Sequence, residues 1–170
     1  NEQIQIIERA KSYLSRPVFF IATNLGEPIN SKYAEFNAVV SGDETVLVYN
    51  VKLPFYEALY FSKKINGRWS APENIIPQLG VDGDVYSTGL SYDGKELIIY
   101  RNDGYDGNLY VTRYVNNRWT PIIRLNDNIN TKYWESHGSL SSDGKTFYFT
   151  SNRKGGYGGL DIYTATRDDI

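Results

Sequence analysis

The sequence predicts an all-β fold made of β-propeller blades, because several landmarks recur at one spacing. A Ser-x-Asp turn motif places Asp43, Asp93 and Asp143 fifty residues apart each time. Trp69 and Trp119 are also fifty residues apart, and each follows a strand-like stretch. Repeats of forty to fifty residues that contain only short strands are typical of propeller blades, each of which needs a neighbour to bury its faces.

A third landmark lies ahead of the turns, where INSKYAEF starts at Ile29 and INTKYWES starts at Ile129. The composition agrees with the fold class, since 15% aromatic residues with 15 Gly and 15 Tyr suit short twisted strands joined by turns. The chain has no Cys, which excludes a disulfide framework and a Cys-ligated metal. The net charge of −2 with both signs interspersed argues against a nucleic-acid partner. No apolar run is long enough to insert into a membrane.

Residues 1–16 are predicted to form a helix or linker ahead of the blades. Ile4, Ile7 and Leu14 recur at helical spacing, and Pro17 ends the pattern because a proline pushes the preceding residue out of the α region. Two interpretations stay open: the helix packs on the flank of the propeller, or it ends a preceding helical domain. The chain begins with Asn1 and contains no Met, so we expect a processed or truncated piece of a longer protein.

The propeller is predicted over residues 17–170 as three blades of the four-stranded type. The stretch VFFIATN, residues 18–24, lies one hundred residues before the outer strand of the second blade, so we interpret it as an orphan outer strand. The blades are predicted at residues 35–76, 86–125 and 136–167, and the third lacks its outer strand.

Three blades are too few to close a ring, for which four to eight are typical. Two resolutions stay open. The chain is part of a longer propeller, or two copies form a homodimer that completes a six-bladed ring. In the second case residues 18–24 of each copy complete the third blade of the other, which removes an exposed sheet edge.

The stretch SSDGKTFYFTSNRKGGYGGLDIYTATR resembles the TolB-type, WD-like propeller repeat of bacterial cell-envelope proteins. The connector NDNINTKYWESHGSLSSDGK resembles the Bacteroidetes form, which lies between tetratricopeptide helices and an OmpA-type domain. The resemblance covers Pro17 to Arg167, although Gly42-Asp43-Glu44 departs from the Asp-Gly-Lys turn. It implies a periplasmic or outer-membrane-associated scaffold that binds protein partners of the envelope and needs no cofactor.

Few residues offer catalytic chemistry. His137 is the only histidine, which excludes His-based metal sites, and we expect it to line the central channel rather than to catalyse. Glu35 and Glu135 occupy equivalent repeat positions, which favours a structural role in each blade over glycoside hydrolysis by a convergent carboxylate pair. Asp103, Asp106 and Asn108 are a weak candidate calcium site, with a tight turn as the alternative.

Trp134 is the leading binding candidate, because its counterpart in the first blade is Ala34 and the repeat does not require an aromatic there. Packing is the alternative. The loop after the second strand of the third blade adds an arginine and a tyrosine that could contact a ligand. The candidate binding residues are Trp134, Tyr133, His137, Arg153 and Tyr157.

The sequence therefore predicts a non-enzymatic protein-interaction scaffold of the cell envelope, in which rigid blades display loops to a partner. One alternative is a module that binds glycans or peptidoglycan fragments through Trp134 and Tyr157. A second alternative is a glycoside-processing propeller enzyme, which requires two carboxylates to converge in a cleft.

Overall fold

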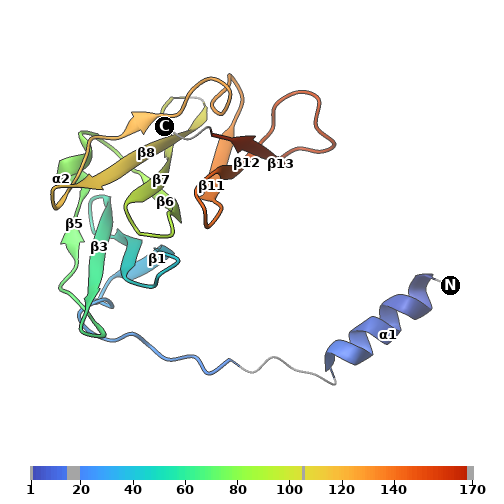
Figure 1. The fold of residues 1–170 in the computed structure, drawn as a ribbon, viewed down its shortest axis with the longest axis horizontal. Helices are drawn as coiled ribbons and strands as arrows, with labels where there is room; N and C mark the ends of the chain where they lie inside the picture. The colour runs from blue at the N-terminus through green and yellow to red at the C-terminus, as the bar shows by residue number, and fades with distance from the viewer. Residues whose placement is uncertain (1, 15–19, 105, 168–170) are drawn as a thin grey trace.

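The computed structural model describes residues 2–14, 20–104 and 106–167. A helix, α1 (Glu2–Leu14), precedes three antiparallel sheets that follow one another along a curve (Figure 1). Each sheet matches the stretch predicted for one blade to within one residue at its start, and the all-β fold of propeller blades is confirmed. The innermost strands of the three sheets lie side by side, so the blades share one inner wall.

The first sheet has the order β1-β2-β3, with two short outer strands that both pair with β3. Its strands are β1 (Ala34–Val40), β2 (Val46–Lys52), β3 (Glu57–Ile65), β4 (Arg68–Trp69) and β5 (Glu73–Asn74). The second sheet repeats this plan one repeat later. Its strands are β6 (Tyr86–Leu90), β7 (Glu96–Asn102), β8 (Gly107–Val115), β9 (Arg118–Trp119) and β10 (Ile123–Arg124).

The third sheet has three strands, β11 (Glu135–Leu140), β12 (Thr146–Ser151) and β13 (Asp161–Thr166). Among the described residues, no strand pairs with the outer edge of β13. The described part of this sheet therefore contains the first three strands of the repeat.

Proline divides the outer strands, which the sequence pattern predicted as single strands. Pro72 separates β4 from β5, and Pro121 separates β9 from β10. A proline has no N–H to donate to a ladder, so pairing is interrupted there and resumes at Glu73 in the first blade and at Ile123 in the second. A short helix, α2 (Ile76–Leu79), follows the first sheet and was not predicted. It has Pro77 in its first turn and ends at Gly80 in the left-handed conformation, as helix ends commonly do.

The predicted strand at residues 18–24 is not formed in the described part of this stretch. Residues 20–24 belong to no strand, and the side chains of Phe20 and Ile21 are exposed. Val18 and Phe19 lie outside the described residues. A strand requires a ladder partner, and among the described strands none pairs with this segment.

The helix α1 lies well away from the sheets in Figure 1. The side chains of Ile4, Ile6 and Ile7 are exposed, so the described part of the helix shows no packing on the propeller flank. The hydrophobic core lies instead between neighbouring blades. One apolar cluster joins the first and second blades, and another joins the second and third.

Candidate functional site

The three innermost strands share an irregularity that shapes the inner wall. Each of β1, β6 and β11 shifts register against its neighbour part-way along, as a β-bulge does. At the shift, Asn37 has φ 51° and His137 has φ 52°, although they lie one hundred residues apart. Positive φ is uncommon for residues other than glycine, and Asn and His are among those that tolerate it best. The bulges therefore present polar side chains at equivalent points of two blades.

A cavity of about 350 Å³ lies at these bulges, which is within the usual range for small-molecule sites. The described residues that line it include no Asp, Glu, Lys or Arg. Within the described chain, the side-chain amide of Asn37, the hydroxyl of Tyr100 and Nε2 of His137 have no hydrogen-bond partner. Nδ1 of His137 lies 2.8 Å from Ser136 Oγ. The lining also includes Tyr86, whose pKa is raised to about 12 by burial and by a hydrogen bond with Glu57.

Trp134 lines this cavity and also packs between two blades. Its ring lies 5.9 Å from that of Tyr100, which in turn lies 6.0 Å from Tyr86. A Cβ on Gly107 would lie 2.9 Å from the indole, so the absence of a side chain there makes room for Trp134. The structure thus gives Trp134 the packing role that was weighed against binding, and leaves part of its surface in the cavity wall.

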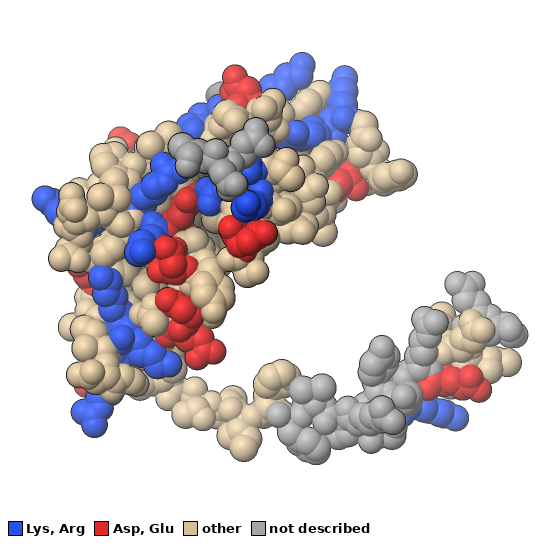
Figure 2. All heavy atoms as spheres, viewed as in Figure 1, with Lys and Arg blue, Asp and Glu red and all other residues tan. Residues whose placement is uncertain are grey.

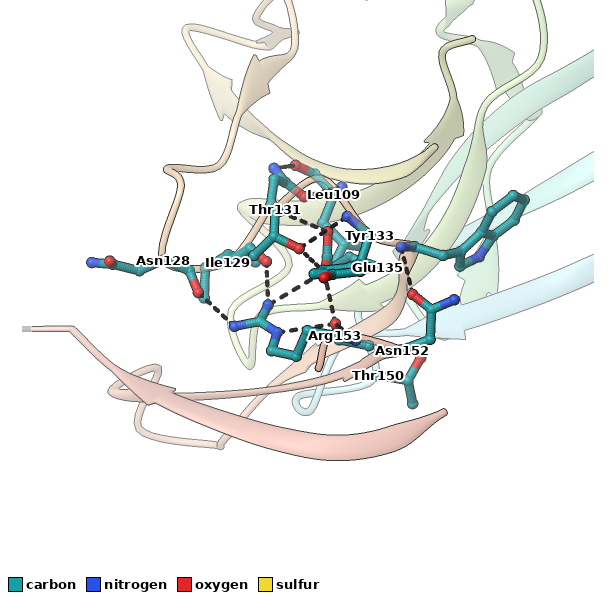
Figure 3. A network of polar contacts seen from close by, with 12 residues as sticks. Leu109, Asn128, Ile129, Thr131, Tyr133, Glu135, Thr150, Asn152 and Arg153 are labelled. Atoms are coloured by element: carbon teal, nitrogen blue, oxygen red, sulfur yellow. Dashed lines mark hydrogen bonds and ion pairs between the residues drawn. The ribbon is translucent and has the colours of Figure 1, made fainter. Parts of the chain in front are cut away.

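Arg153 is held by contacts within the third blade and its connector (Figure 3). Its guanidinium donates to the backbone oxygens of Asn128 (3.1 Å) and Ile129 (2.6 Å) and to Ser151 Oγ (3.0 Å). It also lies 3.4 Å from a carboxylate oxygen of Glu135, which is fully buried. Through these contacts, the guanidinium holds the connector against the third blade.

The carboxylates considered for glycoside chemistry do not converge. Glu135 accepts hydrogen bonds from the Thr131 backbone N–H (2.8 Å) and from Ser151 Oγ (2.7 Å). Glu35 accepts the equivalent bond from the Ser31 backbone N–H at 2.9 Å. The two glutamates therefore close the same turn in different blades, as their repeat positions predicted.

Two of the three candidate calcium ligands, Asp103 and Asn108, are occupied by protein donors. Asp103 accepts hydrogen bonds from Asn108 Nδ2 at 2.6 Å and from the hydroxyl of Tyr110. Burial and this contact with Asp103 raise the pKa of Tyr110 to about 12. The Asn108 side-chain oxygen accepts from Arg124 at 3.1 Å, and the backbone N–H of Asp103 donates to the Asp106 carbonyl at 3.3 Å. The loop is thus closed by its own hydrogen bonds, as the tight-turn alternative predicted.

In the first and third blades, the loops that join the second and third strands carry exposed aromatic tips. Phe55 and Tyr157 are almost completely exposed. Asp161 steadies the loop of Tyr157 by accepting hydrogen bonds from the backbone N–H groups of Tyr157 (2.9 Å) and Gly158 (3.2 Å). Tyr133 is only half-buried and lies next to Lys132, whose ammonium is 5.7 Å from its ring.

The structure does not bring the five predicted binding residues together. Trp134 and His137 meet at the cavity, whereas Tyr157 projects from a loop tip. Asn37, Tyr100 and Phe55 were missed. The repeat alignment could have found Asn37, because it lies one hundred residues before His137, but nothing in the sequence indicated which loop tips are exposed.

Charged side chains of both signs lie next to one another on the face shown in Figure 2. Arg167 pairs with Glu96 at 2.7 Å, and Arg113 lies 3.7 Å from the same carboxylate. Within the described residues, no helix has the length and apolar character needed to span a membrane.

Comparison with solved structures identifies the fold. TolB from Acinetobacter baumannii aligns with a TM-score of 0.57 and 18% identity, over 81% of this chain and 31% of that protein. A structure assigned as TolB from Agrobacterium tumefaciens aligns with a TM-score of 0.56 and 21% identity, over 76% of this chain and 42% of that protein. The fold is that of a TolB-type β-propeller. The chain spans less than half of the length of either TolB structure.

The TolB-type fold confirms the resemblance that the repeats suggested, and at this level of identity it defines the fold alone. A structure of prolyl endopeptidases aligns more weakly, with a TM-score of 0.42 and 15% identity over 90% of this chain and 31% of that one. Comparisons with protein-family models and with curated proteins gave no match.

Proposed function

We propose that this TolB-type segment is a non-enzymatic interaction scaffold of the bacterial cell envelope, located in the periplasm or at the outer membrane. The observation that carries the proposal is the exposure of Phe55 and Tyr157 at the tips of equivalent loops. Aromatic side chains are enriched at protein interfaces, and loops fixed on a rigid scaffold lose little entropy on binding. The resemblance of the repeats to TolB-type envelope proteins supports the compartment.

A non-catalytic role is supported by the use of the acidic side chains. Glu35, Glu135 and Asp161 each accept backbone N–H bonds within their own blade. A retaining or inverting glycosidase requires two carboxylates that flank one bond, at separations of roughly 5–10 Å. The geometry of the described residues therefore favours the scaffold over the glycoside-processing alternative.

The scaffold proposal is tested by binding of the chain to proteins from an envelope extract, followed by quantitative cross-linking. The double variant Phe55→Ser/Tyr157→Ser is expected to lose most of the cross-linked partner. Ile65→Ser/Val115→Ser is the matched control, because these apolar side chains are also exposed. They lie at the last residues of β3 and β8, whereas the loops between the second and third strands precede these strands. Equal losses in both double variants would contradict a specific loop interface.

A glycan-binding module is the second candidate, favoured by the cavity at Asn37, Trp134 and His137. Its lining combines aromatic rings with uncharged hydrogen-bonding groups, which suits a polyhydroxylated ligand better than a charged one. Titration calorimetry with a peptidoglycan disaccharide tests it. His137→Gly removes the imidazole at a positive φ without strain, and Asn66→Gly, with φ 51° in a hairpin turn, is the control. Unchanged binding in His137→Gly would exclude this cavity.

A further inference from the structure

Two grooves occupy equivalent places between neighbouring blades. The first groove lies between the first and second blades and has a volume of about 460 Å³. The second groove lies between the second and third blades and has a volume of about 510 Å³. Each is lined by the end of the third strand of one blade and by the Asp-Gly turn of the next. Because the two grooves follow one plan, their difference in charge comes from single side chains.

In the second groove, a glutamate neutralises the cations. Glu96 and Arg113 are partners across β7 and β8, and the guanidinium lies 3.7 Å from the carboxylate. The same carboxylate lies 2.7 Å from the guanidinium of Arg167, which belongs to the third blade. The charges of this groove are balanced within the protein, because three cations and three carboxylates line it: Lys95, Arg113, Arg167, Asp93, Glu96 and Asp143.

In the first groove, a valine takes the place of this glutamate. Val46 lies fifty residues before Glu96, and its partner across β2 and β3 is Lys63. Lys63 in turn lies fifty residues before Arg113. An opposite-charge pair across two strands in the second blade is therefore a lysine facing an apolar side chain in the first.

The next blade does not supply a carboxylate to Lys63 either. It contributes Tyr114 to the first groove at the position where the third blade contributes Arg167 to the second, since both donate their backbone N–H to the lysine of the Asp-Gly-Lys turn. Nζ of Lys63 lies 4.1 Å from the centre of the Tyr114 ring and 5.7 Å from that of Phe61. Within the described chain, Lys63 has no carboxylate partner. A ring face attracts an ammonium without cancelling its charge.

Two more lysines line the first groove. Nζ of Lys64 lies 4.0 Å from a carboxylate oxygen of Glu44, whose side chain is 77% exposed. Nζ of Lys95 lies 3.3 Å from a carboxylate oxygen of Asp93, and both side chains are exposed. Exposed ion pairs of this kind contribute little binding energy and are easily exchanged for another anion. Three lysines and one aspartate line the groove, so its lining carries a net charge of two positive units.

Uncharged hydrogen-bond donors complete the lining of the first groove. The hydroxyl of Tyr114 and the side-chain amides of Asn116 and Asn117 have no hydrogen-bond partner in the described part of the chain. A phosphate monoester carries a charge of about −1.5 to −2 at pH 7 and three acceptor oxygens, which match this charge and these donors. Lysine binds phosphate as a point charge, and the volume of the groove is within the usual range for small-molecule sites.

We propose that the groove between the first and second blades binds a phosphate monoester, with Lys63 as the main charged contact. The ammonium of Lys63 is the contact because the protein supplies it with no carboxylate, whereas Arg113 at the equivalent position is paired with Glu96. This site is separate from the exposed loop tips and from the cavity at His137. A free organic phosphate and the headgroup of phosphatidic acid present the same chemical group.

Titration calorimetry of the full chain with phenyl phosphate tests the site. Lys63→Gln removes one charge-assisted hydrogen bond, so the dissociation constant is expected to rise about tenfold or more. Lys63→Arg keeps the charge and is expected to retain binding, since the second blade has an arginine at this position. Arg113→Gln is the matched control, because it removes a cation at the equivalent position of the second groove, and it is expected to leave the affinity unchanged.

Two further measurements identify the ligand class and its source. Phenyl sulfate has the same shape as phenyl phosphate with a single negative charge, and it is expected to bind at least about tenfold more weakly if the charge of the groove selects a dianion. Co-sedimentation with phosphatidylcholine vesicles that contain phosphatidic acid tests the lipid source. Binding of phenyl phosphate identifies a free organic phosphate as sufficient, whereas binding to these vesicles alone, lost in Lys63→Gln, identifies a lipid headgroup.

Three results would overturn the proposal. The first is a folded chain that binds neither phenyl phosphate nor the phosphatidic acid vesicles. The second is an equal loss of affinity in Lys63→Gln and Arg113→Gln, which would mean that phosphate binds to surface cations at large. The third is equal affinity for phenyl sulfate and phenyl phosphate. Circular dichroism checks the fold of each variant, and Lys95→Gln, an exposed substitution in the same groove, is expected to weaken binding even if Lys63→Gln unfolds the chain.

Discussion

Single polar side chains in each repeat close a turn that would otherwise leave backbone N–H groups without partners. Ser141 Oγ accepts the Thr146 N–H at 2.9 Å and donates to Asp143 at 2.6 Å, and Asp143 accepts the Lys145 N–H at 3.0 Å. The same arrangement recurs at Ser41 and at Ser91, fifty residues apart. These residues form hydrogen bonds to partners two to five positions away, which is why the sequence pattern alone could predict the turns.

The turn aspartates make the free energy of unfolding depend on pH. Hydrogen bonds from Ser41 and Thr45 hold the pKa of Asp43 below its usual value. Bonds from Ser141 and Lys145 lower the pKa of Asp143 in the same way. A carboxyl group whose pKa is lower in the folded state stabilises the fold at pH values above its pKa in the unfolded state. This stabilisation is lost as the pH falls through its pKa in the folded state. We expect the free energy of unfolding to decrease below about pH 4.

Urea unfolding at pH 7 and pH 3 measures this dependence. In the double variant Asp43→Asn/Asp143→Asn, the free energy of unfolding is expected to differ less between pH 7 and pH 3 than in the unchanged protein. Asp106→Asn is the control, because no side-chain partner of this carboxylate is present in the described structure. An unchanged pH dependence in the double variant would contradict the assignment.

Asn130 is expected to be the most costly asparagine to replace. Asn130→Ala leaves the buried Leu109 N–H without a partner, which should reduce the free energy of unfolding by about 1–3 kcal/mol. Asn30→Ala is the matched control at the equivalent repeat position and should change it by about 0.5 kcal/mol or less. Chemical denaturation measures both. Equal losses would mean that the packing of the connector on β8 does not depend on the Asn130 amide.

At the scale of elements, the innermost strands pack so closely that glycine is required where they cross. A Cβ on Gly89 of β6 would lie 2.5 Å from the Gly138 carbonyl oxygen of β11. The Gly138 backbone cannot move aside as the end of a flexible side chain could. Thr88 Oγ1 also donates to the Gly138 carbonyl at 3.0 Å, so this oxygen is fixed from two sides.

Gly89→Ala is therefore expected to destabilise the fold by about 1–3 kcal/mol through overpacking. Gly159→Ala is the control, because a Cβ at that position meets no atom within 4 Å. Thermal unfolding followed by circular dichroism measures both variants. A Gly89→Ala protein as stable as the control would show that β6 and β11 separate at little cost.

The sequence could predict elements wherever the signal is local or repeated, and it failed where the partner is distant. The strands and their turns follow from alternation and from the Asp motif, and the role of Glu135 follows from its equivalence with Glu35. The exposure of Phe55 depends on what lies beside its loop, and Trp134 packs on Gly107 from another blade. Contacts of that kind are set by the stacking of blades, which no single stretch of sequence encodes.

At the scale of the whole molecule, α1 and the blades are separate in the described structure. The apolar side chains Ile4, Ile6 and Ile7 are exposed, and Figure 1 shows no sheet beside the helix. Deletion of residues 1–14 is therefore expected to leave the melting temperature of the blades unchanged. Differential scanning calorimetry of the full and shortened chains measures this. A fall of several degrees in the shortened chain would show that the helix stabilises the sheets.

The contacts between innermost strands also bear on how fast the chain folds. Ser87 Oγ donates to the Asn37 carbonyl, and Thr88 donates to Gly138, so each of these contacts spans fifty residues. Hairpins within a blade close short loops, while each inter-blade contact closes a loop of one repeat. Loop-closure entropy grows only slowly with length, and folding rates follow the average sequence separation of contacts. Because this separation is fixed by the repeat, each further blade in a propeller of this kind closes a loop of the same length against its neighbour. We therefore expect the loop-closure entropy for each blade to stay constant as blades are added.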